Sequence, residues 1–176
     1  MPHVSPAPVI LLFGLPGAGK TTIARAVAPR LAARGPVEVL DGDELRRALD
    51  PGLGFGRADR ALQGRRACHV AGLLSRHGVT VVVALGAPLA ATRAAFAAAF
   101  DRRGAQVHVD APQPVRVGRD PAGVYAAAAA RGDEAYRSIE GLWEPPAGAD
   151  LVLDTSRLTL AACVDAVLGL GVLDGA

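Results

Sequence analysis

Residues 9–21 read VILLFGLPGAGKT, an apolar run that passes directly into a glycine-rich segment. The eight residues from Gly14 to Thr21 fit the pattern G-x-x-x-x-G-K-[ST] in full. Glycines allow successive backbone N–H groups to turn inward around a polyphosphate, and a following helix directs its positive end at the anion. The pattern requires a strand before it and a helix after it, and both are predicted here. The segment therefore predicts a phosphate-binding loop for a nucleoside triphosphate.

Individual side chains of this loop have distinct expected roles. We expect Lys20 to bridge the outer phosphates of ATP and the Thr21 hydroxyl to bind Mg²⁺. The predicted nucleotide-binding set is Gly14, Pro16, Gly17, Ala18, Gly19, Lys20, Thr21 and Thr22. The alternative is a plain glycine turn between a strand and a helix.

Short apolar runs alternate with longer helical patterns along the rest of the chain. Strands are predicted at Val9–Phe13, Val37–Leu40, Val79–Ala84, Gln106–Val109 and Leu151–Leu153. Helices are predicted at Thr21–Arg34, Arg57–His77, Leu89–Arg103 and Leu160–Leu170. A glycine follows each of these helices and suits a left-handed cap. This alternation predicts an α/β fold, with a five-stranded parallel sheet covered by helices on both faces.

Composition limits the classes of protein to which the chain can belong. Its 176 residues, 51% hydrophobic and 20% charged, are typical of a globular protein, and we expect a single domain over residues 1–176. The net charge of only +2 argues against a nucleic-acid partner. The apolar run at 9–13 is too short to span a membrane and does not resemble an export signal. Cys68 and Cys163 have no metal or disulfide pattern, so we expect reduced thiols and a cytoplasmic protein.

The alternation of strands and helices is interrupted between Arg119 and Gly148. This stretch contains Asp120-Pro121, an alanine run from Ala126 to Ala130 that could form one short helix, and Pro145-Pro146. A long excursion in a compact α/β domain is more often functional than accidental. We therefore predict a mobile lid over approximately residues 119–148.

Two carboxylates, Asp41 and Asp43, follow the second predicted strand, at the sheet edge where open α/β sheets bind ligands. Facing the phosphate loop, Asp41 could orient Mg²⁺ or accept a proton from an attacking hydroxyl. For Asp43, the alternative is a purely structural role as the N-cap of the next helix. Farther along, Arg60 and Arg65 lie on one predicted helix, but their spacing does not place both on one face. A solvated basic face is therefore the alternative to an anion site.

Six motifs, in their order and spacing, resemble the adenylylsulfate kinase (APS kinase) family. They are GLPGAGKTT, VLDGDELR, LGFGRADR, the following Arg-Arg pair, RDPAGVY and DLVLDT. The resemblance extends from about Val9 to the last helix and implies a P-loop kinase fold with ATP and Mg²⁺ as cofactors. It implies transfer of the ATP γ-phosphoryl group to the 3′-hydroxyl of adenosine 5′-phosphosulfate, which gives 3′-phosphoadenosine 5′-phosphosulfate. It also implies a small-molecule nucleotide acceptor as the partner and a possible homodimer.

The resemblance assigns catalytic and metal-binding roles near the phosphate loop. It makes Asp41 the residue that orients the metal or the hydroxyl, with Asp43 as a second carboxylate beside the catalytic Lys20. Thr21 and Asp41 would be the metal ligands, and Arg119 would lie near the ATP at the start of the lid.

The resemblance also assigns the acceptor site. Arg46 and Arg60 would hold the phosphosulfate, and Phe55 would stack on the adenine, with Gln63 and Tyr136 as further acceptor-binding residues. Guanidinium groups suit an anionic acceptor, and an aromatic plane suits a flat base. For Phe55, the alternative is a core anchor.

Departures from the family pattern are concentrated on the acceptor side. Gln63 stands where the family usually has asparagine, and Ala87 stands where it usually has serine. Lysines that are usual in the lid are replaced by Ala122, Ala126 and Ala127. The segment 136–143 also differs, with Tyr136 in place of a phenylalanine. Trp143 could be a stacking group, a hinge anchor or a surface residue.

Because buried polar groups determine which acceptor fits a pocket, these changes leave two alternatives open. One is a kinase of the same family that phosphorylates another nucleotide or a specialised metabolite. The other, which the intact Lys20, Thr21, Asp41 and Asp43 argue against, is a nucleotide-binding protein without turnover.

Overall fold

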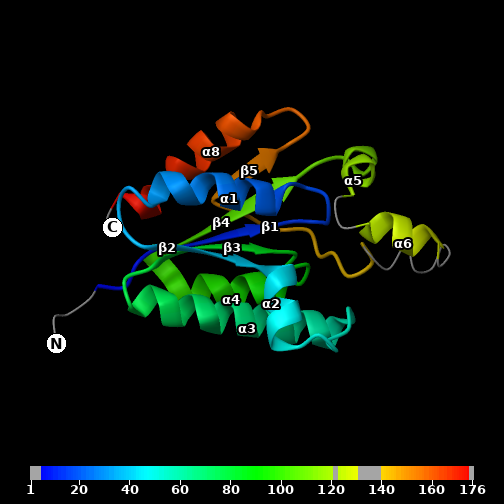
Figure 1. The fold of residues 1–176 in the computed structure, drawn as a ribbon, viewed down its shortest axis with the longest axis horizontal. Coiled ribbons are helices and arrows are strands. Elements are labelled where there is room, and N and C mark those ends of the chain that lie inside the picture. Colours follow the sequence, from blue (N-terminus) through cyan, green and yellow to red (C-terminus); the bar gives the residue numbers. More distant parts are fainter. Residues whose placement is uncertain (1–4, 121–122, 131–139, 175–176) are drawn as a thin grey trace.

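A five-stranded parallel sheet forms the middle layer of the computed structural model, which describes residues 5–120, 123–130 and 140–174 (Figure 1). The strands are β1 (Val9–Phe13), β2 (Val37–Asp41), β3 (Thr80–Leu85), β4 (Gly104–Asp110) and β5 (Leu151–Asp154). Their order in the sheet is β2-β3-β1-β4-β5, and every neighbouring pair is parallel. The structure confirms the predicted α/β class and all five strands, whose ends differ from the predicted ones by at most two residues.

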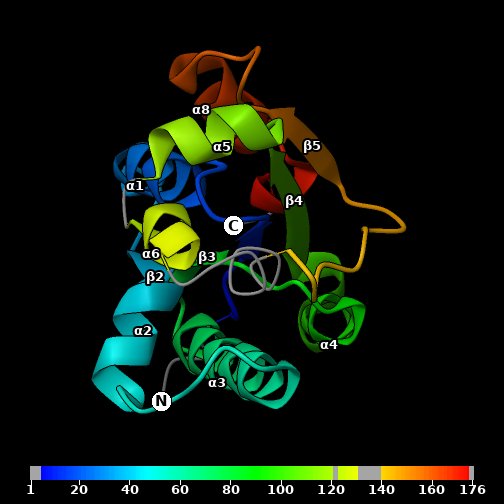
Figure 2. The same cartoon turned by 90° about the vertical axis from the view of Figure 1, so that its right-hand side faces the viewer.

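Helices cover both faces of this sheet. One face carries α1 (Lys20–Leu31) and α8 (Leu160–Leu168), and the other carries α3 (Arg57–Arg76) and α4 (Ala90–Phe100), with α2 (Gly42–Leu49) at its side (Figure 1). The helices α5 (Gln113–Arg119) and α6 (Val124–Ala130) lie beyond the carboxyl ends of the strands (Figure 2). Short 3₁₀ turns occupy Asp101–Arg103 and Gly171–Leu173. Helix α6 confirms the short helix predicted from the alanine run. Helix α5 was not predicted, because two prolines at its start and its length of seven residues give little periodic signal.

The two faces of the sheet are packed by two separate apolar clusters. Alternate residues of β1 divide between them, with Ile10 and Leu12 facing α1 and α8, and Val9, Leu11 and Phe13 facing α3 and α4. Because both faces are buried, β1 is apolar throughout and β3 is apolar from Val81 onward, whereas β4 alternates buried apolar residues with Gln106 and His108. No helix within the described ranges is long and apolar enough to cross a membrane.

The glycine caps predicted at the helix ends are correct at one position. Gly78 follows α3 with φ of +78°, and its N–H donates to the Ser75 carbonyl at 3.0 Å. The prediction was wrong at Gly104, which is extended with φ of −107° because it already begins β4. It was also wrong at Gly171, because α8 ends earlier and is capped by Gly169 with φ of −79°. Helix α1 likewise ends at Leu31, well before Gly35.

Candidate active site

The phosphate loop joins β1 to α1 at the carboxyl edge of the sheet, and its glycines are required by close contacts. Gly14 has φ of +153°, and a Cβ atom there would lie 2.0 Å from the Val109 carbonyl oxygen of β4. Gly17 has φ of +77°, and a Cβ atom there would lie 2.5 Å from the Arg116 carbonyl oxygen. A larger residue at either position would therefore push the loop away from β4 or from α5.

Lys20 begins α1 and turns its ammonium back over the loop. Its Nζ donates to the Leu15 carbonyl at 2.9 Å. Burial lowers the pKa of Lys20 to about 8, although the nearby carboxylates of Asp43 and Asp41 favour its charged form. A desolvated cation held over an anion-binding loop is suited to stabilise charge on phosphate oxygens.

Thr21 and Asp41 form the link between the phosphate loop and β2. The Thr21 hydroxyl donates to Asp41 Oδ2 at 2.6 Å. The other oxygen of this buried carboxylate accepts from the backbone N–H groups of Asp43 and Glu44, at 2.9 and 3.2 Å. Asp41 is thus the N-cap of α2, and the alternative that gave the cap to Asp43 was wrong. Asp43 lies in the first turn of α2, exposed, with its charge directed at Lys20.

The Thr21–Asp41 pair fits a magnesium ion bound together with a nucleotide. No group of three or more His, Cys, Asp or Glu residues within 5–120, 123–130 and 140–174 could hold a metal ion by itself. Mg²⁺ seldom needs such a group, because it binds through one or two protein oxygens, substrate phosphates and water. The hydroxyl and the carboxylate, already in contact, are oxygen donors of this kind. Thr22, also predicted to bind the nucleotide, lies exposed in the same first turn of α1.

Phe55 and two arginines form a cluster in the loop between α2 and α3. The Phe55 side chain is 65% exposed, which excludes the core-anchor alternative. The guanidinium carbons of Arg46 and Arg60 lie 4.5 and 5.7 Å from the centre of its ring. Arg46 also donates to the carbonyls of Leu53 and Gly54, and Arg60 Nε donates to the Phe55 carbonyl at 3.0 Å. The cluster presents an aromatic face and two cations.

Arg60 also connects this cluster to the phosphate loop. Burial and the charge of Arg46 lower the pKa of Arg60, whereas Asp43 favours its charged form. The charge of Arg60 in turn disfavours protonation of Lys20, so the two cations lie within electrostatic reach of each other. Arg65, by contrast, is exposed on α3, which separates the two arginines as their spacing suggested.

Gln63 is 3% exposed on α3 and faces α2. Its Nε2 donates to the Gly42 carbonyl at 2.9 Å. Within the described residues, Gln63 Oε1 is the one buried side-chain polar atom without a hydrogen-bond partner. An unsatisfied acceptor beside α2 and Arg60 fits a residue that receives a hydrogen bond from a ligand.

Arg119 lies against the phosphate loop, at the end of α5. Its guanidinium donates to the Thr155 hydroxyl at 2.8 Å and to the Thr155 carbonyl at 2.7 Å. The Thr155 hydroxyl donates to the Ala18 carbonyl at 2.9 Å. Thr155 is the last residue of the DLVLDT motif. The motif could therefore have identified it as a site residue, but no role was predicted for it.

Trp143 packs against the sheet through a stack of rings. Its ring centre lies 5.6 Å from that of His108 and 6.3 Å from that of Phe13. Arg93, 5% exposed, covers both Phe13 and Trp143 and donates to the carbonyls of Ala87, Pro88 and Glu144. The chain that returns toward β5 is thereby fastened to the start of α4. Sequence reasoning missed Arg93, because an arginine inside an alanine-rich helix carries no motif.

Some predicted positions do not contribute to the described site. Ala126 and Ala127 are exposed on α6. Ala122 and Tyr136 lie outside the described residues, as does half of segment 136–143, of which residues 140–143 are described.

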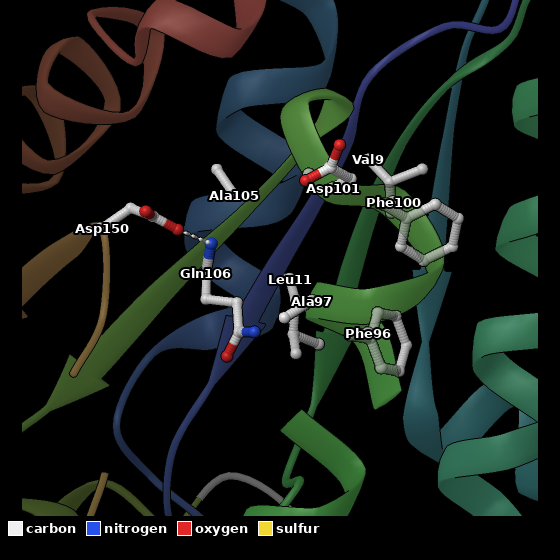
Figure 3. A pocket seen from close by; sticks show the side chains of 10 residues that line it. Val9, Leu11, Phe96, Ala97, Phe100, Asp101, Ala105, Gln106 and Asp150 are labelled. Carbon is white, nitrogen blue, oxygen red and sulfur yellow. Dashed lines mark hydrogen bonds between the residues drawn. The ribbon is translucent and has the colours of Figure 1, made fainter. Parts of the chain in front are cut away.

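A cavity of about 210 Å³ lies elsewhere, at the amino ends of β1 and β4 (Figure 3). Val9, Leu11, Phe96 and Phe100 line it, and Asp101, Gln106 and Asp150 edge it. It contains none of the predicted site residues. The phosphate loop is at the opposite edge of the sheet, so this cavity is not part of the candidate site.

Three features define the chain as a P-loop kinase. They are a phosphate-binding loop at the end of the central strand, a Thr–Asp pair beside the lysine of that loop, and a cluster of two cations around an aromatic ring. Residues 6–154 match the family model described as adenylylsulphate kinase. The chain belongs to the adenylylsulphate kinase family.

Individual relatives agree with this assignment. The chain is 46% identical to the adenylyl-sulfate kinase of Chloroflexus aurantiacus, over 91% of this chain and 86% of the relative. It is 38% identical to the adenylyl-sulfate kinase of Myxococcus xanthus, over 96% and 95% of the two chains. Among solved structures, the APS kinase of Mycobacterium tuberculosis in complex with AMPPNP and APS has a TM-score of 0.84 and 32% identity, and the match covers 97% and 99% of the two chains.

Proposed function

We propose that the chain transfers the γ-phosphoryl group of ATP to the 3′-hydroxyl of adenosine 5′-phosphosulfate. One observation carries the proposal: the Lys20 ammonium, which lies near Asp41 of the Thr21–Asp41 pair, is within electrostatic reach of Arg60, which belongs to the cluster around Phe55. A triphosphate site and an anion-and-base site thus adjoin, as phosphoryl transfer between two nucleotides requires. Family membership supports the same acceptor.

In this proposal, each group near the phosphate loop has one task. The loop amides hold the phosphates, and Lys20 stabilises the charge that develops on the transferred group. Mg²⁺, held by Thr21 and Asp41, would neutralise the β- and γ-phosphates. Asp41 would also orient the acceptor hydroxyl, and Asp43 supports the positive charge of Lys20. Arg119 lies near the ATP.

On the acceptor side, Arg46 and Arg60 hold the phosphosulfate and Phe55 stacks on the adenine. Gln63 supplies its unsatisfied oxygen to the acceptor. Tyr136 adds a second ring, and residues 119–148 act as a lid that excludes water during transfer. The whole chain, residues 1–176, acts as one kinase domain.

The cellular setting is also proposed. Both cysteines are free thiols, which supports a cytoplasmic location. A homodimer is proposed from the family resemblance alone, and light scattering during size-exclusion chromatography tests it.

The test is an assay of purified protein with Mg-ATP and, in separate reactions, adenylylsulfate, AMP, adenosine or no acceptor. Chromatography should show the 3′-phosphorylated product with adenylylsulfate and at least tenfold less product with the other acceptors. A preference for another nucleotide would contradict the proposed acceptor, and turnover with none would contradict the kinase assignment.

Asp41→Asn provides the matched variant. Asparagine is an equally good N-cap, so the melting temperature should change little, whereas loss of the carboxylate charge should lower turnover at least a hundredfold. Turnover within threefold of wild type would exclude the proposed role of Asp41.

A further inference from the structure

Arg116, on α5, is a buried cation for which the sequence predicted no role. Its side chain is only 6% exposed. Its Nε donates to the Ala111 carbonyl at 2.8 Å, and its Nη1 donates to the Tyr125 hydroxyl at 2.6 Å and to Glu140 Oε1 at 2.7 Å. Although burial disfavours the charge, Glu140 and Tyr125 raise the pKa of Arg116, so it stays charged. A fork of donors directed at three partners is a geometry that arginine provides and lysine does not.

The partners of Arg116 come from two separate stretches of the chain. Tyr125 belongs to α6, and Glu140 begins the chain that returns toward β5. Figure 2 shows α5 and α6 side by side in front of the carboxyl edge of the sheet. One guanidinium therefore joins α5, α6 and residue 140 into one unit.

Two further contacts fix this unit to the phosphate loop. The Tyr125 hydroxyl donates to the Pro16 carbonyl at 3.2 Å. The backbone of Arg116 packs on Gly17, where a Cβ atom would lie 2.5 Å from the Arg116 carbonyl oxygen. The charge of Arg116 also reaches Lys20, whose protonated form it disfavours. Arg116 thus contacts the phosphate loop, α6 and residue 140 at the same time.

We propose that Arg116 is a positioning residue for phosphoryl transfer, which holds Tyr125 and Glu140 in place above the phosphate loop so that ATP reacts with the acceptor rather than with water. This inference rests on the proposed function. Arg116 acts through its partners, and it need not touch a substrate. Its loss should release α6 and residue 140 together and admit water to the γ-phosphate.

The test compares Arg116→Met with wild type in two assays: transfer to adenylylsulfate, and ATP hydrolysis without acceptor. We expect kcat for transfer to fall at least thirtyfold, KM for the acceptor to change less than threefold, and the ratio of hydrolysis to transfer to rise about tenfold. Arg66→Met is the matched control. Arg66, on α3, forms an ion pair with Asp50 at the end of α2, so its replacement should leave all three values unchanged.

Tyr125→Phe is the second variant, and it removes the hydroxyl that joins Arg116 to Pro16 while the Arg116–Glu140 ion pair remains. It should raise the hydrolysis-to-transfer ratio at least threefold even if Arg116→Met does not fold. A folded Arg116→Met with wild-type kcat, or an unchanged ratio in Tyr125→Phe, would overturn the proposal.

Trp143 supplies a readout that is independent of the acceptor, because it is the single tryptophan of the chain and lies three residues after Glu140. Quenching of its fluorescence by acrylamide should increase about twofold in Arg116→Met and not in Arg66→Met. Increased quenching in a protein whose wild type does not phosphorylate adenylylsulfate would contradict the proposed function and leave the positioning role standing. Unchanged quenching in Arg116→Met would contradict the positioning role of Arg116.

Discussion

Replacing Lys20 with methionine should make the protein more stable while it abolishes turnover. The Lys20 ammonium is desolvated beside the phosphate loop, and this lowers its pKa to about 8 from the ordinary 10.5. A lowered lysine pKa means that the folded state binds the proton more weakly than the unfolded chain does. The charge needed for catalysis therefore opposes folding in the absence of ATP.

The size of the effect follows from that pKa. Each unit of difference between the pKa of the unfolded chain and that of the folded state corresponds to about 1.4 kcal/mol. Keeping Lys20 protonated in the folded state therefore lowers the free energy of unfolding by about 3 kcal/mol at pH 7. Methionine keeps the chain length but loses the hydrogen bond to the Leu15 carbonyl, which contributes about 1 kcal/mol. Lys20→Met should thus raise the free energy of unfolding by about 2 kcal/mol, or the melting temperature by about 4–8 °C for a chain of this length.

The effect should also depend on pH. Below pH 8 both states of the wild type carry the proton and the full penalty is present. Between pH 8 and about 10.5 the folded state has released the proton while the unfolded chain still binds it, so wild-type stability rises through this window. The advantage of Lys20→Met should accordingly shrink as the pH approaches 10.5.

Urea unfolding at pH 7 and pH 10, without nucleotide and with a chelator, tests both the predicted stabilisation by Lys20→Met and its predicted pH dependence. Arg25→Met is the control, since Arg25 lies exposed on the same helix and should change stability by less than about 0.5 kcal/mol at either pH. If Lys20→Met were no more stable than wild type at pH 7, or if the difference were the same at both pH values, the reasoning from desolvation would be refuted.

Two further substitutions test the acceptor cluster and the helix packing. Phe55→Ala should raise KM for adenylylsulfate about tenfold with little change in melting temperature, because the exposed ring would stack on a base. Leu49→Ala, which removes another exposed apolar side chain from α2, should change neither value, and an unaltered KM in Phe55→Ala would exclude the stacking role. Gly64→Ala should lower the free energy of unfolding, measured by chemical denaturation, by about 2 kcal/mol, because its Cβ would lie 2.4 Å from Thr92 Cγ2. Adding Thr92→Ala should restore most of this loss, and a double variant as unstable as Gly64→Ala alone would contradict the expectation.

The fold was predictable because its strongest signals are local. Continuous apolar runs marked the buried strands, and the glycine pattern at 14–21 fixed the edge of the sheet at which ligands bind. Helix ends were less predictable, because a glycine favours a left-handed cap only when no strand begins there, as one does at Gly104. Helix α5 was missed because its seven residues form less than two full turns between two loops.

Residues of the site could be predicted only where they belong to a recognisable sequence motif. The phosphate loop, Asp41 and the cluster around Phe55 each belong to a quoted motif, and the structure brings them to one edge of the sheet. Arg93 and Arg116 belong to no motif. Their roles come from distant carbonyls and carboxylates that meet only in the folded chain, and no spacing in the sequence could have shown this.

Arg116 also bears on the lysines that the family usually has on the segment that forms α6 here. Ala126 and Ala127, which stand where the family usually has lysines, are exposed on α6, so a long side chain there would be free to move in solvent. Arg116 instead places a cation in a fixed, buried position one helix away, held by three partners. Its donors are occupied by Ala111, Tyr125 and Glu140, so it does not take the place of a lysine that would bind a substrate directly. Arg116 therefore acts through Tyr125 and Glu140 rather than on the acceptor, which is why its loss should impair turnover more than the binding of either substrate.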